Sequence, residues 1–157
     1  MKNILTHRNP DLDAIVSAWL AQDFLFESEK SRVVFVSRKI PGRIRQTADC
    51  IVDVGNAYDP QHGFFDHKPP AFKNRNSTCA SKLLYEYLRS LGRDIGHLES
   101  LIQITFEGDT HRHTATVKQS RRNGPHARLK HLKEKHREDA EVYARMIDWL
   151  RDYNEPA

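Results

Sequence analysis

Short hydrophobic runs recur along the first half of the chain. Three of them, Asn3–Leu5, Arg32–Val36 and Cys50–Val54, are apolar or β-branched and are bounded by polar or turn-forming residues. Runs of this length, separated by segments with helical spacing, are typical of strands in a parallel sheet. The first half of the chain is therefore predicted to alternate between strands and helices.

The segment between the first two runs, Pro10–Phe26, has the spacing of an amphipathic helix. Asn9 suits the N-cap position of this helix, and Pro10 suits its first helical position. The apolar residues that recur every three or four positions are Leu12, Ile15, Val16, Trp19 and Leu20.

The second half of the chain has mostly helical spacing. Ser77–Leu91 carries a regular apolar repeat and is followed by Gly92, while Ile95–Phe106 repeats the pattern more loosely and is followed by Gly108. Pro125 is expected to open a long C-terminal helix. The apolar face of that helix consists of Val142, Tyr143, Met146, Trp149 and Leu150.

These patterns predict an α/β fold in a single domain over residues 1–157. We expect a short, mainly parallel sheet of about four strands flanked by helices over 1–110, and a basic helical extension over 111–157. A chain of 157 residues suits one domain. No apolar run approaches the roughly 20 residues of a membrane span, and Cys50 and Cys79 form no CxxC pair. We therefore expect a soluble cytoplasmic protein that does not bind membranes.

Positive charge is concentrated in one segment, Lys118–Arg137, which holds eight Lys or Arg residues against the single acid Glu134. The remainder of the chain holds 17 basic and 20 acidic residues and is slightly negative. A basic segment on an acidic body favours a polyanionic ligand such as a nucleic acid or a phosphate compound. A solvated helix face explains the same segment equally well.

Acids and histidines stand at the ends of several predicted elements. They are His7, Asp11, Asp13, Asp53, Asp66, His67 and Asp109. Taken by themselves, Asp11 and Asp13 could simply stabilise the dipole of the helix that they begin. Asp53, however, lies in an otherwise apolar run, where an acid is costly unless it is paired or binds a cation. Ligands of parallel sheets bind beyond the carboxyl ends of the strands, which is where these residues are expected to lie.

Carboxylates combined with imidazoles suit Mn²⁺ or Mg²⁺, whereas structural zinc prefers thiolates. The set is larger than one such ion takes from a protein when water and substrate also bind. Two ions that share a carboxylate are the usual arrangement for hydrolysis of phosphate esters and anhydrides. Asp11 and Asp13 are two residues apart and are expected to serve different ions. We therefore expect two divalent ions as cofactors, Mn²⁺ first, with Mg²⁺ or Co²⁺ as alternatives.

The order of these motifs resembles the DHH phosphoesterase superfamily, which includes manganese-dependent inorganic pyrophosphatases and RecJ-type exonucleases. The segment His7-x-Asn-Pro-Asp11-x-Asp13 is similar to its first metal motif, Asp53 to the second, Asp66-His67 to the third and Asp109 to the fourth. Residues 52–67 are also similar to the melanocyte-proliferating-gene-1-like branch of metal-dependent hydrolases or exonucleases. The resemblance covers about residues 3–109. It implies a two-metal site, bridged by Asp53, whose ligands are His7, Asp11, Asp13, Asp53, His67 and Asp109.

Two departures from that superfamily matter. The third letter of the DHH signature is Lys68. The resemblance implies that this position contacts the substrate phosphate, and a lysine keeps a charge there without titrating near neutral pH. Members usually carry a second, C-terminal domain that grips the substrate, and the residues after Asp109 are too few and too helical for one. Either the basic segment replaces that domain, or a second subunit closes the site, or the protein binds phosphate without efficient turnover.

The expected function is a metal-dependent phosphohydrolase that cleaves a phosphodiester or phosphoanhydride with a metal-activated water. Asp13 is expected to orient the water and Lys68 to neutralise the phosphate oxygens. Further residues expected to contact the phosphate-containing substrate are Arg112, His113, Arg122 and His126. The alternative is a catalytically weak DHH-like module that binds a nucleotide or RNA. We also expect a homodimer in which the apolar face of the C-terminal helix packs on a second copy, although that face suits packing on its own sheet as well.

Overall fold

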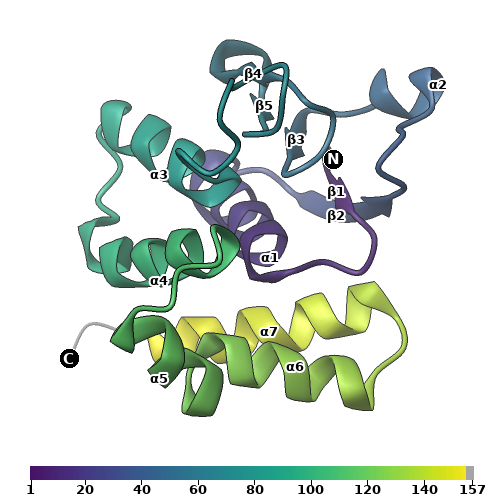
Figure 1. The fold of residues 1–157 in the computed structure, drawn as a ribbon. Coiled ribbons are helices and arrows are strands. Elements are labelled where there is room, and N and C mark those ends of the chain that lie inside the picture. Colours follow the sequence, from purple (N-terminus) through teal and green to yellow (C-terminus); the bar gives the residue numbers. More distant parts are fainter. Residues whose placement is uncertain (155–157) are drawn as a thin grey trace.

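The computed structural model describes residues 1–154 and shows a five-stranded sheet flanked by helices (Figure 1). The strands are β1 (Lys2–His7), β2 (Ser31–Val36), β3 (Cys50–Val52), β4 (Tyr58–Asp59) and β5 (Phe64–Phe65). Their order is β2-β1-β3-β5-β4, and every neighbouring pair is parallel except β4 and β5. The predicted α/β fold with a mainly parallel sheet is confirmed. The sheet has one strand more than expected because β4 and β5 are too short to leave a pattern in the sequence.

Seven α-helices and three shorter turns make up the helical part of the described residues. The helices are α1 (Leu12–Leu20), α2 (Gly42–Arg45), α3 (Ala80–Ser90), α4 (Glu99–Asp109), α5 (Ala115–Asn123), α6 (Pro125–Lys135) and α7 (Asp139–Tyr153). A π-helical turn over Ala21–Leu25 continues α1, and 3-10 turns cover Pro60–His62 and Gly96–Leu98. Among residues 1–154, no helix is both long and apolar enough to cross a membrane.

The two faces of the sheet bury different sets of side chains because successive residues of a strand point to opposite sides. Ile4, Cys50 and Val52 point into the main core, on the face where α1, α3 and α7 contact the strands or one another. Leu5 and Ile51 point into a smaller cluster on the other face, beneath the segment that contains α2. The main core lies on the α1 side of the sheet.

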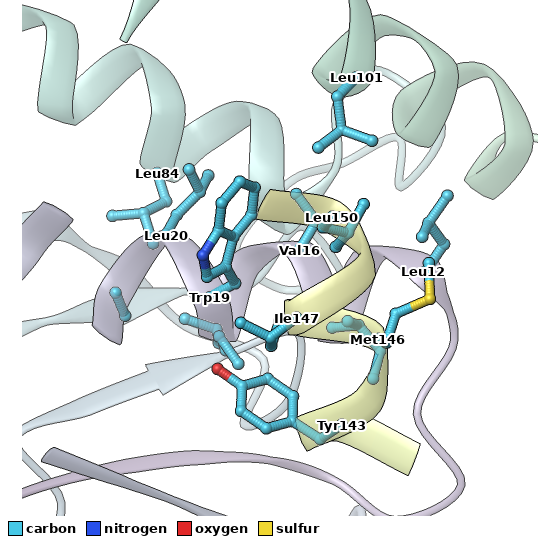
Figure 2. Packing of buried hydrophobic residues seen from close by; sticks show 14 of the residues in the cluster. Leu12, Val16, Trp19, Leu20, Leu84, Leu101, Tyr143, Met146, Ile147 and Leu150 are labelled. Carbon is cyan, nitrogen blue, oxygen red and sulfur yellow. The ribbon is translucent and has the colours of Figure 1, made fainter. Parts of the chain in front are cut away.

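The C-terminal helix α7 belongs to the main core. Figure 2 shows Met146, Ile147 and Leu150 of α7 beside Leu12 and Trp19 of α1. The predicted apolar face is therefore used inside the chain, on α1 and β2, where Val142, Tyr143, Met146 and Leu150 are buried. This packing leaves those side chains unavailable to a second copy, and the homodimer stays a prediction that needs another surface.

The start of α1 differs from the expectation. Asp11, not Asn9, is the N-cap, and its carboxylate accepts a hydrogen bond from the backbone N–H of Ala14 at 2.9 Å. Asn9 instead has a φ of 51°, in the left-handed region that asparagine tolerates better than most residues. The chain turns at Asn9 between strand and helix, so Pro10 precedes the helix rather than opening it.

The helices after residue 100 also differ from the expectation. The C-terminal helix is two helices, because His136 adopts an extended conformation between α6 and α7 and turns the chain back. The two helices pack as a hairpin beside α1 (Figure 1). Gly108 does not end its helix: α4 continues to Asp109, and Gly108 packs so tightly on the imidazole of His126 that a Cβ would collide with it. The short helix α5 was not predicted.

Candidate metal centre

The carboxyl ends of three parallel strands meet at one edge of the sheet and carry the predicted motifs. His7 is the last residue of β1, Asp53 directly follows β3, and Asp66 directly follows β5. Asp13 in the first turn of α1 and Asp109 in the last turn of α4 reach the same place, as the distances below show. The edge is the position at which open parallel sheets bind their ligands.

The first group of candidate ligands consists of His7, Asp11 and Asp53. Nε2 of His7 lies 3.1 Å from Oδ2 of Asp53 and 3.7 Å from Oδ1 of Asp11. The other ring nitrogen, Nδ1, lies 2.9 Å from the carbonyl oxygen of Arg8. A hydrogen bond from Nδ1–H to a carbonyl directs Nε2 toward the carboxylates, which is the usual arrangement for a metal-binding histidine.

The second group consists of Asp13, Asp53 and His67, with Asp109 beside it. Nε2 of His67 lies 3.5 Å from Oδ1 of Asp53, 3.4 Å from Oδ2 of Asp109 and 4.0 Å from Oδ2 of Asp13. Its Nδ1 lies 2.6 Å from the carbonyl oxygen of Arg75. Nε2 is buried and has no hydrogen-bond partner among the described residues. A buried ring nitrogen that faces three carboxylate oxygens without bonding to any is suited to an ion between them.

Asp53 belongs to both groups. In each group the ligand atoms lie within 4.8 Å of one another, and the carboxylate of Asp53 presents Oδ2 toward His7 and Oδ1 toward His67. Its backbone has a φ of 56°, and its N–H donates to the carbonyl of Phe65 at 3.0 Å. This turn at the end of β3 aims the side chain along the edge of the sheet instead of into the core.

The pKa values of these side chains are shifted by burial and by the charges of their neighbours in the cluster. Burial alone would lower the pKa of His7 and of His67, but the facing carboxylates raise it to about 10 for His7 and about 9 for His67. Burial alone would raise the pKa of Asp53, but both histidines and Lys68 hold it well below its usual range. Burial and the charges of Asp53 and Asp11 raise the pKa of Asp109 to about 6. The cluster therefore attracts positive charge.

Lys68 supplies part of that positive charge. Its ammonium donates to Oδ1 of Asp53 at 2.6 Å, to the carbonyl oxygen of Asp53 at 2.9 Å and to Oδ1 of Asp66 at 3.0 Å. Asp66 accepts further bonds from the backbone N–H groups of Asn56 and His67, which fix its carboxylate in the turn after β5. Lys68 was expected at a substrate phosphate, and in the structure its ammonium lies against the carboxylate of Asp53, which both candidate groups share.

Asp13 has a structural partner in addition to the cluster. Its two carboxylate oxygens accept the backbone N–H groups of Ala80 and Ser81 at 2.9 and 2.8 Å, in the first turn of α3. The N-cap residue of α3, Cys79, makes no side-chain cap bond, so Asp13 caps this helix from α1. Burial and the charges of Asp53 and Asp109 raise the pKa of Asp13. These bonds fix the orientation of the carboxylate beside His67.

A hollow of about 240 Å³ opens on the second group. Its walls are formed by Asp11, Leu12, Asp13, Arg75, Thr105, Gly108, Asp109, His111 and His126. His126 lies where the sequence analysis expected a substrate contact. Arg75 and His111 also line the hollow and were not predicted: Arg75 lies in a turn outside any motif, whereas the closeness of His111 to Asp109 was a signal that could have indicated it.

Three expected substrate contacts lie elsewhere. The guanidinium of Arg112 lies over the ring of Phe106 at 4.9 Å and donates to Thr110. His113 and Arg122 are exposed, and neither belongs to the wall of the hollow. Arg112 and His113 were expected there because they follow Asp109 closely in sequence, and Arg122 because it lies near the start of α6, but the chain turns away from the centre after α4.

The side chains at this edge fit divalent cations that prefer oxygen and imidazole ligands. The fit rests on the unpartnered Nε2 of His67 and on the two ligand groups that share Asp53. Comparison of the chain with protein-family models, with curated proteins and with solved structures gave no match.

Proposed function

We propose that this chain is a metal-dependent phosphohydrolase that cleaves a phosphodiester or phosphoanhydride. The observation that carries the proposal is the sharing of Asp53 by two groups of ligands, one with His7 and Asp11 and one with Asp13 and His67. The resemblance of the motif order to the DHH superfamily supports the same interpretation. Mn²⁺ is the first candidate metal, and Mg²⁺ and Co²⁺ accept similar ligands.

The roles of the residues follow from their contacts. His7 and Asp11 would hold one cation, while Asp13, His67 and Asp109 would hold the other. When bound, such cations lower the pKa of a coordinated water and neutralise charge on the phosphate.

Three of these side chains are oriented before any ligand arrives. Backbone carbonyls fix the rings of His7 and His67, and the first turn of α3 fixes Asp13 beside them. Asp13 is thereby positioned to orient a water. Lys68 lies at Asp53 with a charge available to the oxygens of a phosphate. Fixed charges of this kind need no reorganisation during the reaction.

The test is hydrolysis by the Asp53→Asn variant. Asparagine removes the charge but tolerates the left-handed backbone at this position, so it perturbs the fold less than alanine would. Asp49→Asn is the matched control, because Asp49 precedes the same strand and accepts from Asn3 at 2.8 Å, at the opposite end of β3. Pyrophosphate, a chromogenic phosphodiester and short RNA are assayed with Mn²⁺, Mg²⁺ or EDTA. Hydrolysis that requires metal, is lost in Asp53→Asn and persists in Asp49→Asn supports the proposal. Equal rates in both variants would refute it.

A second candidate function rests on Lys68. An ammonium 2.6 Å from Oδ1 of Asp53 already occupies the side of that carboxylate that faces the second group. Such an internal cation favours a module that binds a nucleotide or RNA without efficient turnover. Tight binding of the RNA with no product in any metal would support this alternative.

A further inference from the structure

A second hollow adjoins the metal centre. It has a volume of about 380 Å³, within the range of small-molecule sites, and lies between the first turn of α1 and α6. Its floor is apolar and is formed by Leu12 and Leu129, both nearly fully buried. It shares Asp11, Leu12 and His126 with the hollow at the metal centre, so the two hollows are adjacent.

The wall of the second hollow carries two lysines, Lys130 and Lys133, and two acids, Asp11 and Glu134. Lys130 and Lys133 of α6 lie three residues apart on one face of the helix, with Glu134 beside them. Lys133 is half-buried, and burial lowers the pKa of its ammonium while the charges of Asp11 and Asp139 act against that effect. Lysine stems extend apolar surface and keep their charged ends in water. The hollow therefore combines buried leucines with the apolar stems of two lysines, which suits a compact apolar group whose anion lies at the neighbouring metal centre.

His126 stands at the junction of the two hollows. Its Nδ1 lies 2.7 Å from the Oγ of Ser120, and the same Oγ accepts the backbone N–H of His126 at 3.2 Å. Nε2 lies against Gly108 in the wall of the metal hollow. Burial and the charge of Arg121 lower the pKa of His126, so the ring is neutral at pH 7. With Nδ1 engaged by Ser120, Nε2 is the ring atom left to contact a ligand that crosses the junction.

We propose that the second hollow binds the leaving group of the substrate, and that the substrate is an organic phosphate ester with a compact apolar ring rather than inorganic pyrophosphate. The proposal rests on the proposed function, because the phosphate is expected at the metal centre. In the reaction, the water oxygen bonds to phosphorus and the P–O bond to the organic group breaks. One hydrogen of the water ends on the leaving oxygen and the other on the phosphate. A second phosphate as leaving group would gain nothing from Leu12 and Leu129.

The test compares the binding of two non-hydrolysable phosphonates in the presence of Mn²⁺. Benzylphosphonate and methylphosphonate carry the same anionic group and differ in the apolar ring. By calorimetric titration, benzylphosphonate is expected to bind at least about tenfold more tightly to the wild-type chain. Leu129→Ala is expected to remove most of this preference, because Leu129 is one of the two leucines in the wall of the hollow.

Leu132→Ala is the matched control. Leu132 is buried on the same helix but outside the wall of the hollow, so both variants lose a buried leucine and only one changes the site. Lys130→Gln, at an exposed position of the wall, gives a second variant that does not disturb the core, and it is expected to weaken the binding of benzylphosphonate more than that of methylphosphonate.

Equal affinities for the two phosphonates in the wild-type chain would overturn the leaving-group site and leave the proposed function standing. A benzyl preference that survives Leu129→Ala would place the ring elsewhere and also overturn it. Failure of both phosphonates to bind with Mn²⁺ would overturn the proposed function as well.

Discussion

Substitution of Lys68 by methionine tests the charge balance of the centre. The ammonium of Lys68 contacts Asp53 and Asp66, whose side chains are 2% and 0% exposed, while Lys68 itself is 16% exposed. Removing one partner of a buried ion pair typically costs about 3–5 kcal/mol. His7 and His67 still compensate Asp53, so we expect the lower end, about 3 kcal/mol of unfolding free energy. For a chain of this size that corresponds to a fall in Tm of about 6–12 °C.

Mn²⁺ is expected to reverse much of this loss. A divalent cation held by Asp53 and His67 neutralises the same carboxylate that Lys68 contacts, and it also repels the ammonium. The rise in Tm on addition of Mn²⁺ should therefore be larger in Lys68→Met than in the wild-type chain, by several degrees. Thermal unfolding of EDTA-treated and Mn²⁺-saturated samples measures both values. Lys2→Met is the control, because Lys2 pairs with Asp49 at the surface and such pairs contribute little. The same Mn²⁺-induced rise in Lys68→Met and wild type would refute the overlap of Lys68 with the metal centre.

Three further outcomes are expected. Mn²⁺ binding near pH 7.5 should release about two protons and tighten with rising pH up to about 10, because His7 and His67 are protonated without metal, with pKa values of about 10 and about 9, and a ligand nitrogen must be free. Titration calorimetry in buffers of different ionisation enthalpy counts these protons, and a count of zero would contradict the arrangement. Gly63→Ala should lower the free energy of unfolding by at least about 2 kcal/mol, whereas Gly92→Ala should lower it by only about 1 kcal/mol. Both glycines have a positive φ, but only a Cβ at Gly63 meets a backbone carbonyl, and urea titration of the two variants measures the difference. The thiols of Cys50 and Cys79 are buried, and burial raises their pKa, so neither should react with a thiol reagent at pH 8 until the chain unfolds. Mass spectrometry of the alkylated protein detects any earlier reaction.

The sheet and the place of the motifs could be predicted because both depend on local pattern. Short apolar runs mark β1, β2 and β3, and the geometry of parallel strands brings the residues that follow them to one edge. The break at His136 could not be predicted in this way. The basic residues around it suit a helix, and only the packing of α7 on α1 requires the chain to reverse there. The two-residue strands β4 and β5 are likewise set by their neighbours, not by their own sequence.

The sequence indicated which residues come together at the candidate site, but not the individual hydrogen bonds that they make there. The proximity of His7, Asp53 and His67 was expected because all three lie at or beyond the carboxyl ends of strands in a parallel sheet. The bonds from Asp13 to the first turn of α3 join residues 67 and 68 positions apart, and no local pattern reports them. Lys68 was expected at a substrate because it follows a metal motif. Its contact with Asp53 depends on the turn after β5, where Asp66 is held by Asn56.

Helix α6 contributes His126 to the wall of the hollow at the candidate metal centre. The sequence left open whether the basic segment or a second subunit closes the site. In the structure, His126 of α6 reaches the metal hollow while Leu129 and Lys133 of the same helix line the adjoining one. These residues are spaced three and four apart, so a single helical face carries all three. That face is held in place by α7, whose own apolar side chains are buried on α1. Because α7 is buried against α1, the hairpin holds α6 so that His126, Leu129 and Lys133 lie beside Asp11. Because these residues belong to the same chain, the basic segment lines the hollow beside its own candidate metal centre without a second copy.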